Sequence, residues 1–525
     1  MIKKAKKMLI KPLVLSILAL LLTSCVLFRD DPAGITGLNY GVWFNTVWAE
    51  WPQIAGVNSF TVELIRNGGP PAALTGDCAQ FLIRRVNNGW RVDAPGLHND
   101  SNYVMHIRRA DTNDIVHVTS GLQTTPFDRQ GYAFIPAGPR PHTLGAYYLD
   151  GTPRTNAEII YVTHENMNEA LDPARFPAAG GNSTTPGGNP LIIRFIGTVG
   201  VLGYVGDHSG IPVAARNANS FLTIRNSTAG ITIEGIGPDA VIYGFGFQIH
   251  SSSDVVVRNL SFRKFFEDAI GIHGNNSHVQ THFWIHNNTI YTGQDSRHLP
   301  GRDDDHRFGD GAVDITNWAN HFTVSYNRFV DSDKVLLWGN SMADMITYGT
   351  LHHNWFINAE SRMPRVRNGW IHVFNNLYDG VRNYAIGAGH RGNIIAEGNT
   401  FRNARRPFII SGIGHGGTSL GEDYPGAIIT NLVPDYQILT GRALQPNDMD
   451  TFSRITFDPA LDIGAHNSYT RRIHTGEVVT RTHTFVPFNP PVSQTIGSAV
   501  GSTVGVQTAA DSAAKVRAYA GVMRR

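Results

Sequence analysis

The sequence has little from which disulfides or bulk electrostatic binding could be built. Its 525 residues include two cysteines, and only 16% of them are charged. Five of its lysines precede residue 25, where no acidic residue occurs, and the rest of the chain holds 39 basic against 42 acidic side chains. This near balance argues against wholesale binding to nucleic acid, so we expect no nucleic-acid partner.

The N-terminus lacks an apolar run long enough to cross a membrane. Residues 1–25, MIKKAKKMLIKPLVLSILALLLTSC, open with lysines and continue with an apolar stretch from Pro12 to Leu22. Such a segment is typical of an export signal and is too short for a spanning helix. Its end, Leu22-Thr23-Ser24-Cys25, resembles a bacterial lipobox, which implies lipidation of Cys25 and a mature chain anchored by acyl chains.

Two further expectations follow from this N-terminus. Val26 lacks the acidic character known to retain some lipoproteins in the inner membrane, so we expect the outer membrane, on its periplasmic or outer face, or else secretion. Cys78 would be the only thiol of the mature chain, so no intramolecular disulfide can form and stability must come from burial.

Residues 33–125 alternate apolar and polar residues in short bursts separated by turns, which predicts a small antiparallel β-sandwich. Trp51, Leu97 and Tyr103 give this segment a resemblance to a fibronectin type III domain, and an unrelated sandwich is the alternative. Residues 126–142, rich in Pro and Gly, read as a linker. A second domain is expected over residues 143–525.

A short phrase recurs inside this second domain: a β run, then asparagine, one residue, and a large apolar residue. Its copies are HFWIHNNTI (282–290), HFTVSYNRF (321–329), YGTLHHNWF (348–356), WIHVFNNLY (370–378) and NIIAEGNTF (393–401). The last three intervals between the asparagines are 27, 22 and 23 residues. One strand per irregular period in the twenties, with no alternating amphipathic helix, predicts a stacked parallel β-helix. The repeated asparagines are expected to form a structural ladder at one bend rather than to catalyse.

Three carboxylates stand out on this predicted scaffold. Asp268 lies in FFEDAIGIHG, and Asp310 and Asp314 lie in GDGAVDIT on a later turn. Carboxylates gathered at one point are costly unless a cation joins them, and hard oxygen ligands suit Ca²⁺ better than Zn²⁺. Spacing alone is a weak signal, however, and a solvated acidic edge is the more common explanation.

Cations follow the carboxylates on the next turns. Lys334 lies in DSDKVLLWGNS, and Arg362, Arg365 and Arg367 lie in SRMPRVRNGW around Pro364. Arginine forks suit substrate carboxylates, so a site for a metal and an anionic ligand is one interpretation. A surface network of ion pairs with neighbouring acids is the other, and composition alone does not decide between them.

These motifs together resemble the pectate lyases of polysaccharide lyase family one. The resemblance rests on GDGAVDIT, DKVLLWGNS, LHHNWF and RMPRVRNGWIHVFNNLY, and it covers most of residues 145–410 in the family's order. It implies an all-β, right-handed parallel β-helix that cleaves α-1,4-linked polygalacturonate by Ca²⁺-dependent β-elimination, leaving 4,5-unsaturated ends. A monomer is expected.

The resemblance also implies roles for individual residues. Arg362 matches the family's catalytic base, and Arg367 and Lys334 match residues that contact substrate. Arg365, which lies between the two arginines, is expected to bind substrate as well. Asp268, Asp310 and Asp314 match the calcium ligands. A free guanidinium keeps its proton at neutral pH, so an arginine base is chemically awkward and Lys334 is the alternative base.

The sequence departs from the family in three places. Trp284-Ile285-His286-Asn287 stands where the family often has W-I-D-H, which puts local geometry in question. The loop of residues 292–311 is long and charged, and its Asp303, Asp304 and Asp305 are a weaker candidate for a second cation site. Residues 411–508 match poorly, whereas AADSAAKVRAYAGV (509–522) resembles the family's closing segment, which would pack against the coil.

Three rival functions stay open at this point. A pectin lyase would act on methylated substrate without calcium, and the retained aspartates argue against it. A hydrolase on the same fold needs carboxylates on both sides of the bond, one of them protonated, and the arginine signature disfavours it. A non-catalytic, membrane-tethered glycan-binding protein would not require Arg362 and Lys334.

Overall fold

The computed structural model describes residues 37–134, 144–176, 188–201, 210–216, 221–275, 280–292, 309–341, 344, 346–389, 392–404, 407–410, 428–432, 468–472, 478–482 and 509–523. Cys25 and Asp303–Asp305 lie outside the described residues. The chain divides into two compact units, and the boundary between them in the sequence lies between Thr125 and Pro126. Within the described residues, no helix has the length and apolar character needed to cross a membrane.

The first unit contains two antiparallel sheets. One has the strand order β1 (Asn39–Trp43), β2 (Thr46–Pro52), β6 (Gly89–Ala94) and β5 (Ile83–Val86). The other has the order β4 (Pro71–Ala73), β3 (Phe60–Arg66), β7 (Asn102–Arg109) and β8 (Ile115–Val118), with β9 (Leu122–Gln123) paired to β7. A short helix, α1 (Asp77–Leu82), precedes β5.

Apolar side chains from both sheets form the core of this unit. Trp51 of β2 is 2% exposed, and its ring lies edge-on to that of Phe60 at 5.1 Å. The hydroxyl of Tyr103 accepts a hydrogen bond from the backbone N–H of His98 at 3.2 Å, which ties the strand to the turn before it. Two antiparallel sheets are therefore confirmed, while the relationship to fibronectin type III domains stays a prediction.

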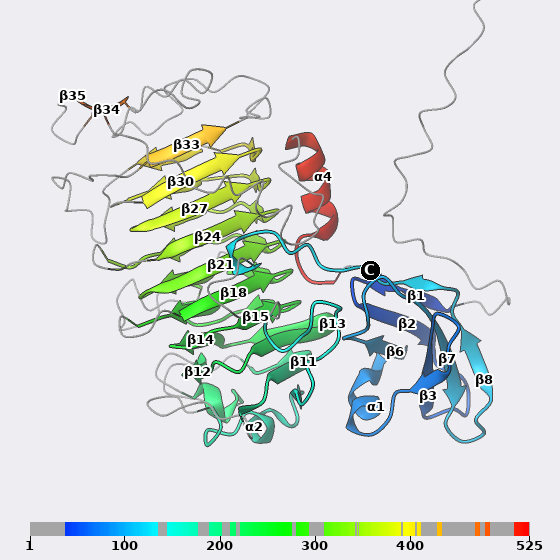
Figure 1. Cartoon of the computed structure of the whole chain (residues 1–525). Coiled ribbons are helices and arrows are strands. Elements are labelled where there is room, and N and C mark those ends of the chain that lie inside the picture. The colour runs from blue at the N-terminus through cyan, green and yellow to red at the C-terminus, as the bar shows by residue number, and fades with distance from the viewer. Residues whose placement is uncertain are drawn as a thin grey trace, which may run out of the picture. The chain divides into compact units, whose positions relative to one another are not determined.

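The second unit is a parallel β-helix, drawn in Figure 1 as a stack of arrows. Its 8-stranded sheet has the order β12 (Phe221–Arg225), β14 (Gly246–His250), β17 (Ile270–His273), β20 (Val313–Thr316), β23 (Leu337–Trp338), β26 (Arg365–Val366), β29 (Ile386–Ala388) and β32 (Phe408–Ile410). Each strand pairs in parallel with the corresponding strand of the next turn.

A 16-stranded sheet forms the other two walls of the coil, and both of its arms start from the long strand β13 (Ile231–Tyr243). One arm continues through β15 (Val255–Arg258), β18 (Gln280–His286), β21 (Ala319–Ser325), β24 (Thr347–His352), β27 (Gly369–Phe374), β30 (Gly392–Glu397) and β33 (Ile428–Leu432). The other continues through β16 (Ser261–Arg263), β19 (Thr289–Tyr291), β22 (Arg328–Val330), β25 (Trp355–Ile357), β28 (Leu377–Asp379) and β31 (Thr400–Arg402). Strands β10 (Glu158–Val162) and β11 (Leu191–Val199) precede β13 in this sheet.

Four short elements lie among the described residues of the second unit. They are the helix α2 (Met167–Ala170), the 3₁₀ turns η1 (Tyr132–Phe134) and η3 (Val213–Ala215), and the C-terminal helix α4 (Ala509–Tyr519). A separate antiparallel pair, β34 (Ser468–Arg472) and β35 (Val478–Thr482), lies in the part of the sequence that matched the family poorly.

The predicted asparagine ladder is present at the bend between the two arms of the 16-stranded sheet. In the series Asn288, Asn327, Asn354, Asn376 and Asn399, each member after the first accepts a hydrogen bond on its side-chain oxygen from the backbone N–H of the preceding member, at 2.9–3.0 Å. The oxygen of Asn288 accepts from the backbone N–H of Leu260 at 3.0 Å. All five asparagines are at most 3% exposed. The ladder satisfies buried backbone donors that no strand pairing reaches, so its role is structural.

The large residue two places after each asparagine points into the coil. The rings of Phe329, Phe356, Tyr378 and Phe401 stack with centroids 5.0, 4.8 and 4.6 Å apart. These distances match the spacing of neighbouring strands, so one aromatic residue per turn fills the core continuously. The sequence repeat thus corresponds to one turn of the coil.

Residues 127–134 differ from the linker expected there, because they pack on the 16-stranded sheet. The backbone N–H of Tyr132 donates to Thr350 Oγ1 at 3.0 Å, and that of Ala133 donates to Thr323 Oγ1 at 3.1 Å. The ring of Phe134 lies edge-on to that of Trp284 at 4.8 Å. Residues 127–134 therefore cover part of the sheet rather than forming a free connection.

Helix α4 packs on the β-helix as the sequence indicated. Val516 and Ala520 are fully buried against Leu377 and Trp355, and the backbone N–H of Gly521 donates to Tyr326 O at 2.8 Å. Figure 1 shows this helix alongside the stack of strands.

Candidate active site

The three predicted aspartates lie on stacked turns at the edge of the 8-stranded sheet. Asp268 precedes β17, and Asp314 lies in β20, where it pairs with Gly271 of β17. The backbone N–H of Asp310 donates to Glu267 O at 2.7 Å, which fixes the two loops side by side. Parallel stacking thus brings together carboxylates that are more than forty positions apart in the sequence.

Gly311 lies directly beside two of these carboxylates. A Cβ at this position would overlap with Asp268 Oδ1 and would come within 3.0 Å of Asp314 Oδ1. Only glycine lets the backbone approach the carboxylate oxygens this closely. The turn of Gly311 is therefore shaped around Asp268 and Asp314.

The surroundings of Asp268 and Asp314 favour the protonated forms of their carboxyl groups. Burial, reinforced by Asp314 and Asp310, raises the pKa of Asp268 well above its usual range. Burial likewise raises the pKa of Asp314 to about 7, although the backbone N–H of Leu337 donates to its Oδ1 at 2.9 Å. The described cations nearby do not compensate for these buried negative charges, and a further positive charge would stabilise their ionised forms.

Two predicted cations come from the next two turns. Lys334 pairs in parallel with Gly311 on one side and with Ser361 on the other, and its Nζ lies 2.7 Å from Asp310 Oδ1. Arg362 follows Ser361, and its charge favours ionisation of both Asp268 and Asp314. Its backbone φ of +62° lies in the left-handed region, which is uncommon for a long side chain and marks a sharp bend at this residue.

Arg367 lies one strand further along, with its guanidinium held by the preceding turn. Its Nη1 donates to Gly339 O at 2.9 Å and to Asn340 O at 3.2 Å. The side chain remains half-buried, so part of it faces solvent. Arg365, by contrast, is only 3% exposed, and its burial disfavours the direct substrate contact suggested from the sequence.

Comparisons with known proteins bear on this arrangement. Residues 178–411 match a family model described as pectate lyase. The chain is 33% identical over 280 residues to "Pectate lyase 2" of Pectobacterium atrosepticum, covering 53% of this chain and 69% of that protein. The chain belongs to the pectate lyase family.

Two other relatives of the family match over shorter stretches. "Pectate lyase 2" of Pectobacterium carotovorum is 32% identical over 250 residues, which cover 47% of this chain and 65% of that protein. A "Pectate trisaccharide-lyase" of Thermotoga sp. is 40% identical over 162 residues, 28% of this chain and 39% of that protein. The chain therefore spans about two thirds of the first two relatives' length.

Solved structures align with three quarters of the chain. A pectate lyase of Bacillus sp. N165 in complex with trigalacturonate is 21% identical, with a TM-score of 0.47, 75% of this chain and 98% of that chain covered. A mutant of pectate lyase C in complex with pentagalacturonic acid is 23% identical, with a TM-score of 0.48, 75% of this chain and 95% of that chain covered.

The aspartates of this pectate lyase family member fit a calcium ion chemically. Carboxylate oxygens and waters are the ligands that Ca²⁺ prefers, and opposite ligands of one ion lie about 5 Å apart. Asp268 and Asp314 supply such oxygens next to the space that a Cβ on Gly311 would fill, and Asp310 lies at Lys334 on the same edge. Burial and the neighbouring carboxylates raise the pKa of Asp268 and of Asp314, so a bound cation would favour their ionised forms.

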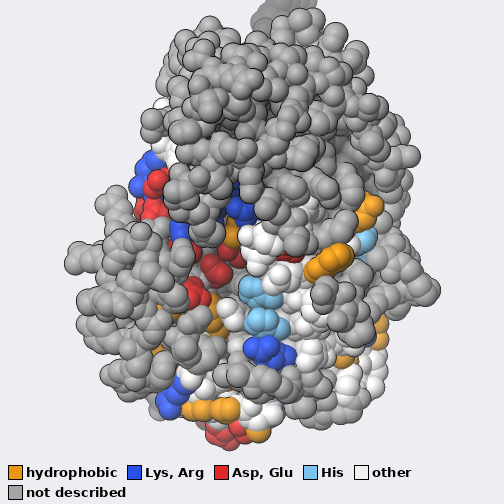
Figure 2. All heavy atoms as spheres, turned by 90° about the vertical axis from the view of Figure 1, so that its left-hand side faces the viewer, with side chains coloured by type: hydrophobic (Ala, Val, Ile, Leu, Met, Phe, Trp, Pro, Cys, Tyr) orange, Lys and Arg blue, Asp and Glu red, His pale blue; other side chains and the backbone are white. Residues whose placement is uncertain are grey.

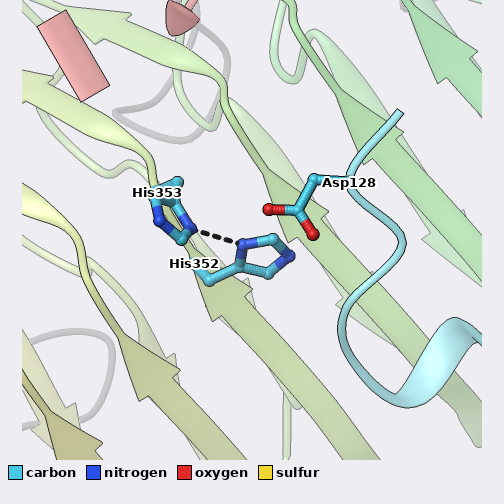
Figure 3. Close-up of side chains that lie close together, drawn as sticks. All are labelled: Asp128, His352 and His353. Atoms are coloured by element: carbon cyan, nitrogen blue, oxygen red, sulfur yellow. Dashed lines mark hydrogen bonds between the residues drawn. The ribbon is translucent and has the colours of Figure 1, made fainter. Parts of the chain in front are cut away.

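A second cluster in the same unit, shown in Figure 3, has different properties. Asp128, His352 and His353 are the one group among the described residues whose three candidate ligand atoms lie within 4.8 Å of one another. His352 Nε2 donates to Gln130 O at 3.2 Å, so its Nδ1 accepts the proton of His353 Nδ1 at 2.8 Å.

Asp128 in this second cluster is fully engaged by protein groups. Its Oδ2 accepts a hydrogen bond from the hydroxyl of Tyr326 at 2.6 Å and lies 3.4 Å from Lys515 Nζ of α4. Burial opposes ionisation of Asp128, but His352 and Lys515 outweigh it and lower the pKa of the carboxyl. The cluster therefore fastens residues 127–134 and α4 to the sheet, and it does not need a metal ion.

Two residues of the site escaped the sequence analysis. Gly311 stands in GDGAVDIT between the two quoted aspartates, and a glycine between two carboxylates could have been recognised as a close-approach position. Glu267 adds negative charge next to Asp268, as the preceding letter of FFEDAIGIHG would have suggested.

Proposed function

We propose that the protein is a pectate lyase that cleaves α-1,4-linked polygalacturonate by Ca²⁺-dependent β-elimination, leaving 4,5-unsaturated oligogalacturonates. One observation carries this proposal: the undercompensated carboxylates of Asp268 and Asp314 adjoin Asp310, Lys334 and Arg362 on consecutive turns of one sheet. A site of this kind accepts a divalent cation and a polyanion together.

The reaction removes a weakly acidic proton. The proton on carbon 5 of a galacturonate unit lies next to a carboxylate that is already charged, so its loss creates a second negative charge. When bound, Ca²⁺ would supply positive charge that neutralises this carboxylate and stabilises the enolate-like intermediate. The electron pair then forms the double bond between carbons 4 and 5, and the glycosidic oxygen at carbon 4 leaves and takes up a proton.

Arg362 is the proposed base, because the bend at its backbone places it next to Asp268 and Asp314 on the side of Lys334. It must be deprotonated to act. The neighbouring carboxylates oppose this, and a high pH together with a bound Ca²⁺ that neutralised them would favour it. Lys334 Nζ lies 2.7 Å from Asp310 Oδ1 and retains further N–H donors for a substrate carboxylate. Arg367 holds a second substrate carboxylate, and buried Arg365 takes a supporting position instead of a substrate contact.

An ultraviolet assay on polygalacturonate tests this function. Absorbance of the unsaturated product should rise with the enzyme and Ca²⁺ and should stop when a chelator is added. Reducing ends without absorbance would indicate hydrolysis. Full activity in chelator, with methylated pectin preferred, would indicate a pectin lyase, and no turnover at all would favour a glycan-binding protein.

We further propose that the mature protein is lipid-anchored through Cys25 at the outer membrane and that its first unit is a spacer or docking domain. The lipobox-like Leu22-Thr23-Ser24-Cys25 supports the anchor. Replacement of Cys25 by Ser should release the protein from the membrane fraction or leave an unprocessed precursor. An unchanged membrane fraction, together with an unmodified N-terminus in the parent, would contradict it.

A further inference from the structure

The 8-stranded sheet carries an outward row of polar side chains next to the candidate active site. Arg225 of β12 pairs with His250 of β14, His250 pairs with His273 of β17, and His273 pairs with Thr316 of β20. We call Arg225, His250 and His273 the histidine row. Side chains alternate across a strand, so this row lies on the same face as Asp314, two residues before Thr316.

The neighbouring positions confirm this orientation. Ile224, Ile249 and Ile272, one residue before each member of the row, are at most 1% exposed and belong to the core of the coil. The members of the row are themselves partly exposed. Figure 2 shows histidine side chains on one face of the molecule, between acidic side chains and a basic side chain.

The two imidazole rings are held in fixed positions. They stack with centroids 4.8 Å apart and planes 23° from parallel. His273 Nδ1 is hydrogen-bonded to Thr316 Oγ1 at 2.8 Å, and His250 Nε2 lies 3.1 Å from Gln248 Oε1. The rings therefore form a rigid platform along the coil axis.

His273 Nε2 reaches back towards the aspartates. A Cβ on Gly271, the residue paired with Asp314, would lie 2.8 Å from this nitrogen. The nitrogen has no hydrogen-bond partner within the described part of the chain. Because this nitrogen is also buried, the row meets a ligand through its partly exposed atoms rather than through His273 Nε2.

The charge of the row is confined to one end. Burial, together with His273 and Arg225, lowers the pKa of His250 to about 3. Burial also lowers the pKa of His273 to about 4, against the influence of Asp344. Asp344 itself accepts backbone N–H groups of Trp318 and Asn340 at 3.2 and 2.9 Å. Both imidazoles are thus neutral near neutral pH, and Arg225 supplies the positive charge.

We propose that the histidine row extends the substrate-binding site and holds sugar units of an anionic polysaccharide beyond those that react. The proposal rests on the proposed pectate lyase function. Two features support it. The neutral imidazole rings of His273 and His250 continue the face of the sheet that carries Asp314. The guanidinium of Arg225 follows them, where it can pair with further carboxylates of a uronic acid chain. Arg225 is three strand spacings from Thr316, or roughly 14 Å. A long chain reaches this distance, and a short oligomer bound at the aspartates does not.

The test compares substrates of different length. KM is measured on polygalacturonate and on trigalacturonate for the parent, Arg225→Gln and Arg225→Lys. The KM on polygalacturonate divided by the KM on trigalacturonate should rise about tenfold in Arg225→Gln, as expected for the loss of one charge-assisted contact. In Arg225→Lys this ratio should stay near the parental value. Arg263→Gln, on β16 of the other sheet, is the matched control.

An unchanged ratio in Arg225→Gln, or an equal change in Arg263→Gln, would overturn the proposal. Calorimetric titration of the same four proteins with polygalacturonate separates it from the proposed function. If the parent shows no elimination activity, and if Arg225→Gln weakens polygalacturonate binding while Arg263→Gln does not, the binding role of the histidine row is supported. The proposed lyase reaction is then contradicted. If Arg225→Gln melts below the parent, His250→Phe is used in its place. This variant keeps a flat ring but removes the ring nitrogens, and we expect a smaller rise in the KM ratio.

Discussion

Carboxylates on the two sheets of the β-helix have opposite surroundings. Glu234, on β13 of the 16-stranded sheet, accepts hydrogen bonds from Arg194 Nε and Arg258 Nε at 2.9 Å each and from the hydroxyl of Tyr147 at 2.6 Å. Burial opposes its ionisation, but Arg258 and Arg194 outweigh it and lower the pKa of Glu234. Asp314, on the 8-stranded sheet, is partly exposed, and desolvation by its surroundings nevertheless raises its pKa to about 7.

This contrast separates structure from function. A carboxylate whose partners are all supplied by the chain stabilises the fold and needs nothing else. Carboxylates that the chain gathers and leaves undercompensated lower stability, and they persist where a ligand supplies the missing charge. By this criterion Glu234 and Asp128 are structural, and Asp268, Asp310 and Asp314 form the site.

The largest expected effect comes from exchanging an arginine in each region. Arg362→Lys keeps a cation but loses the fork geometry and reach of a positioned base, so kcat should fall about 10²–10⁴-fold with folding intact. Arg258→Lys, beside Glu234, should lower the melting temperature and leave kcat near the parental value. Steady-state kinetics with thermal melting checks both. Near-parental kcat in Arg362→Lys, with loss of activity in Lys334→Ala, would make the lysine the base.

The next effect concerns the structural network alone. Glu234→Gln leaves Arg194 and Arg258 without their buried counter-charge, so the free energy of unfolding should fall by about 3–5 kcal/mol. Denaturant titration with and without Ca²⁺ measures it. The loss should be the same in both conditions, because Glu234 belongs to no metal site; a loss that Ca²⁺ reverses would contradict the assignment.

Asp314→Asn should stabilise the metal-free protein, whereas Glu234→Gln should destabilise it. A pKa raised in the folded state means that the folded protein binds more protons than the unfolded one, so stability falls as pH rises from about 4 to about 7. The substitution removes this cost and should raise the free energy of unfolding at pH 8 by at most about 4 kcal/mol. Denaturant titration in chelator at pH 5 and pH 8 is the measurement. A variant less stable than the parent at pH 8 would contradict the account.

Much of this arrangement follows from the sequence, because the β-helix repeats its own signals. Asn354 and Phe356 recur as Asn376 and Tyr378, so one interpretation of the repeat predicts both the ladder and the aromatic stack. The carboxylates and cations could be placed on consecutive turns for the same reason, once strands were assigned to turns.

Other features could not be predicted because they depend on contacts distant in sequence. Asp128 lies in a Pro- and Gly-rich segment that carries no strand pattern, and only the folded chain brings it to Tyr326 and Lys515. The burial of Arg365, two residues before half-buried Arg367 on the same face of the sheet, depends on how neighbouring turns cover it. Neither position has a repeated counterpart from which it could be inferred.

The smallest of the expected effects is at Asp128. Asp128→Asn removes the charge that pairs with Lys515 but keeps an oxygen for the hydroxyl of Tyr326, so the free energy of unfolding should fall by about 1.5–3 kcal/mol. Denaturant titration measures this loss, and kinetics on polygalacturonate provides the control, since kcat should not change. Loss of activity without loss of stability would place this cluster in the reaction.

Calcium-dependent melting of three proteins tests the central contrast most directly. Melting temperatures of the parent, Asp314→Asn and Asp128→Asn are measured in chelator and in Ca²⁺ at about one hundred times its dissociation constant for the parent. The account predicts that Ca²⁺ stabilises the parent and Asp128→Asn by about 2.7 kcal/mol and leaves Asp314→Asn nearly unaffected. Equal stabilisation of all three proteins, or loss of the calcium effect in Asp128→Asn instead, would contradict the assignment of Asp268, Asp310 and Asp314 as the calcium site.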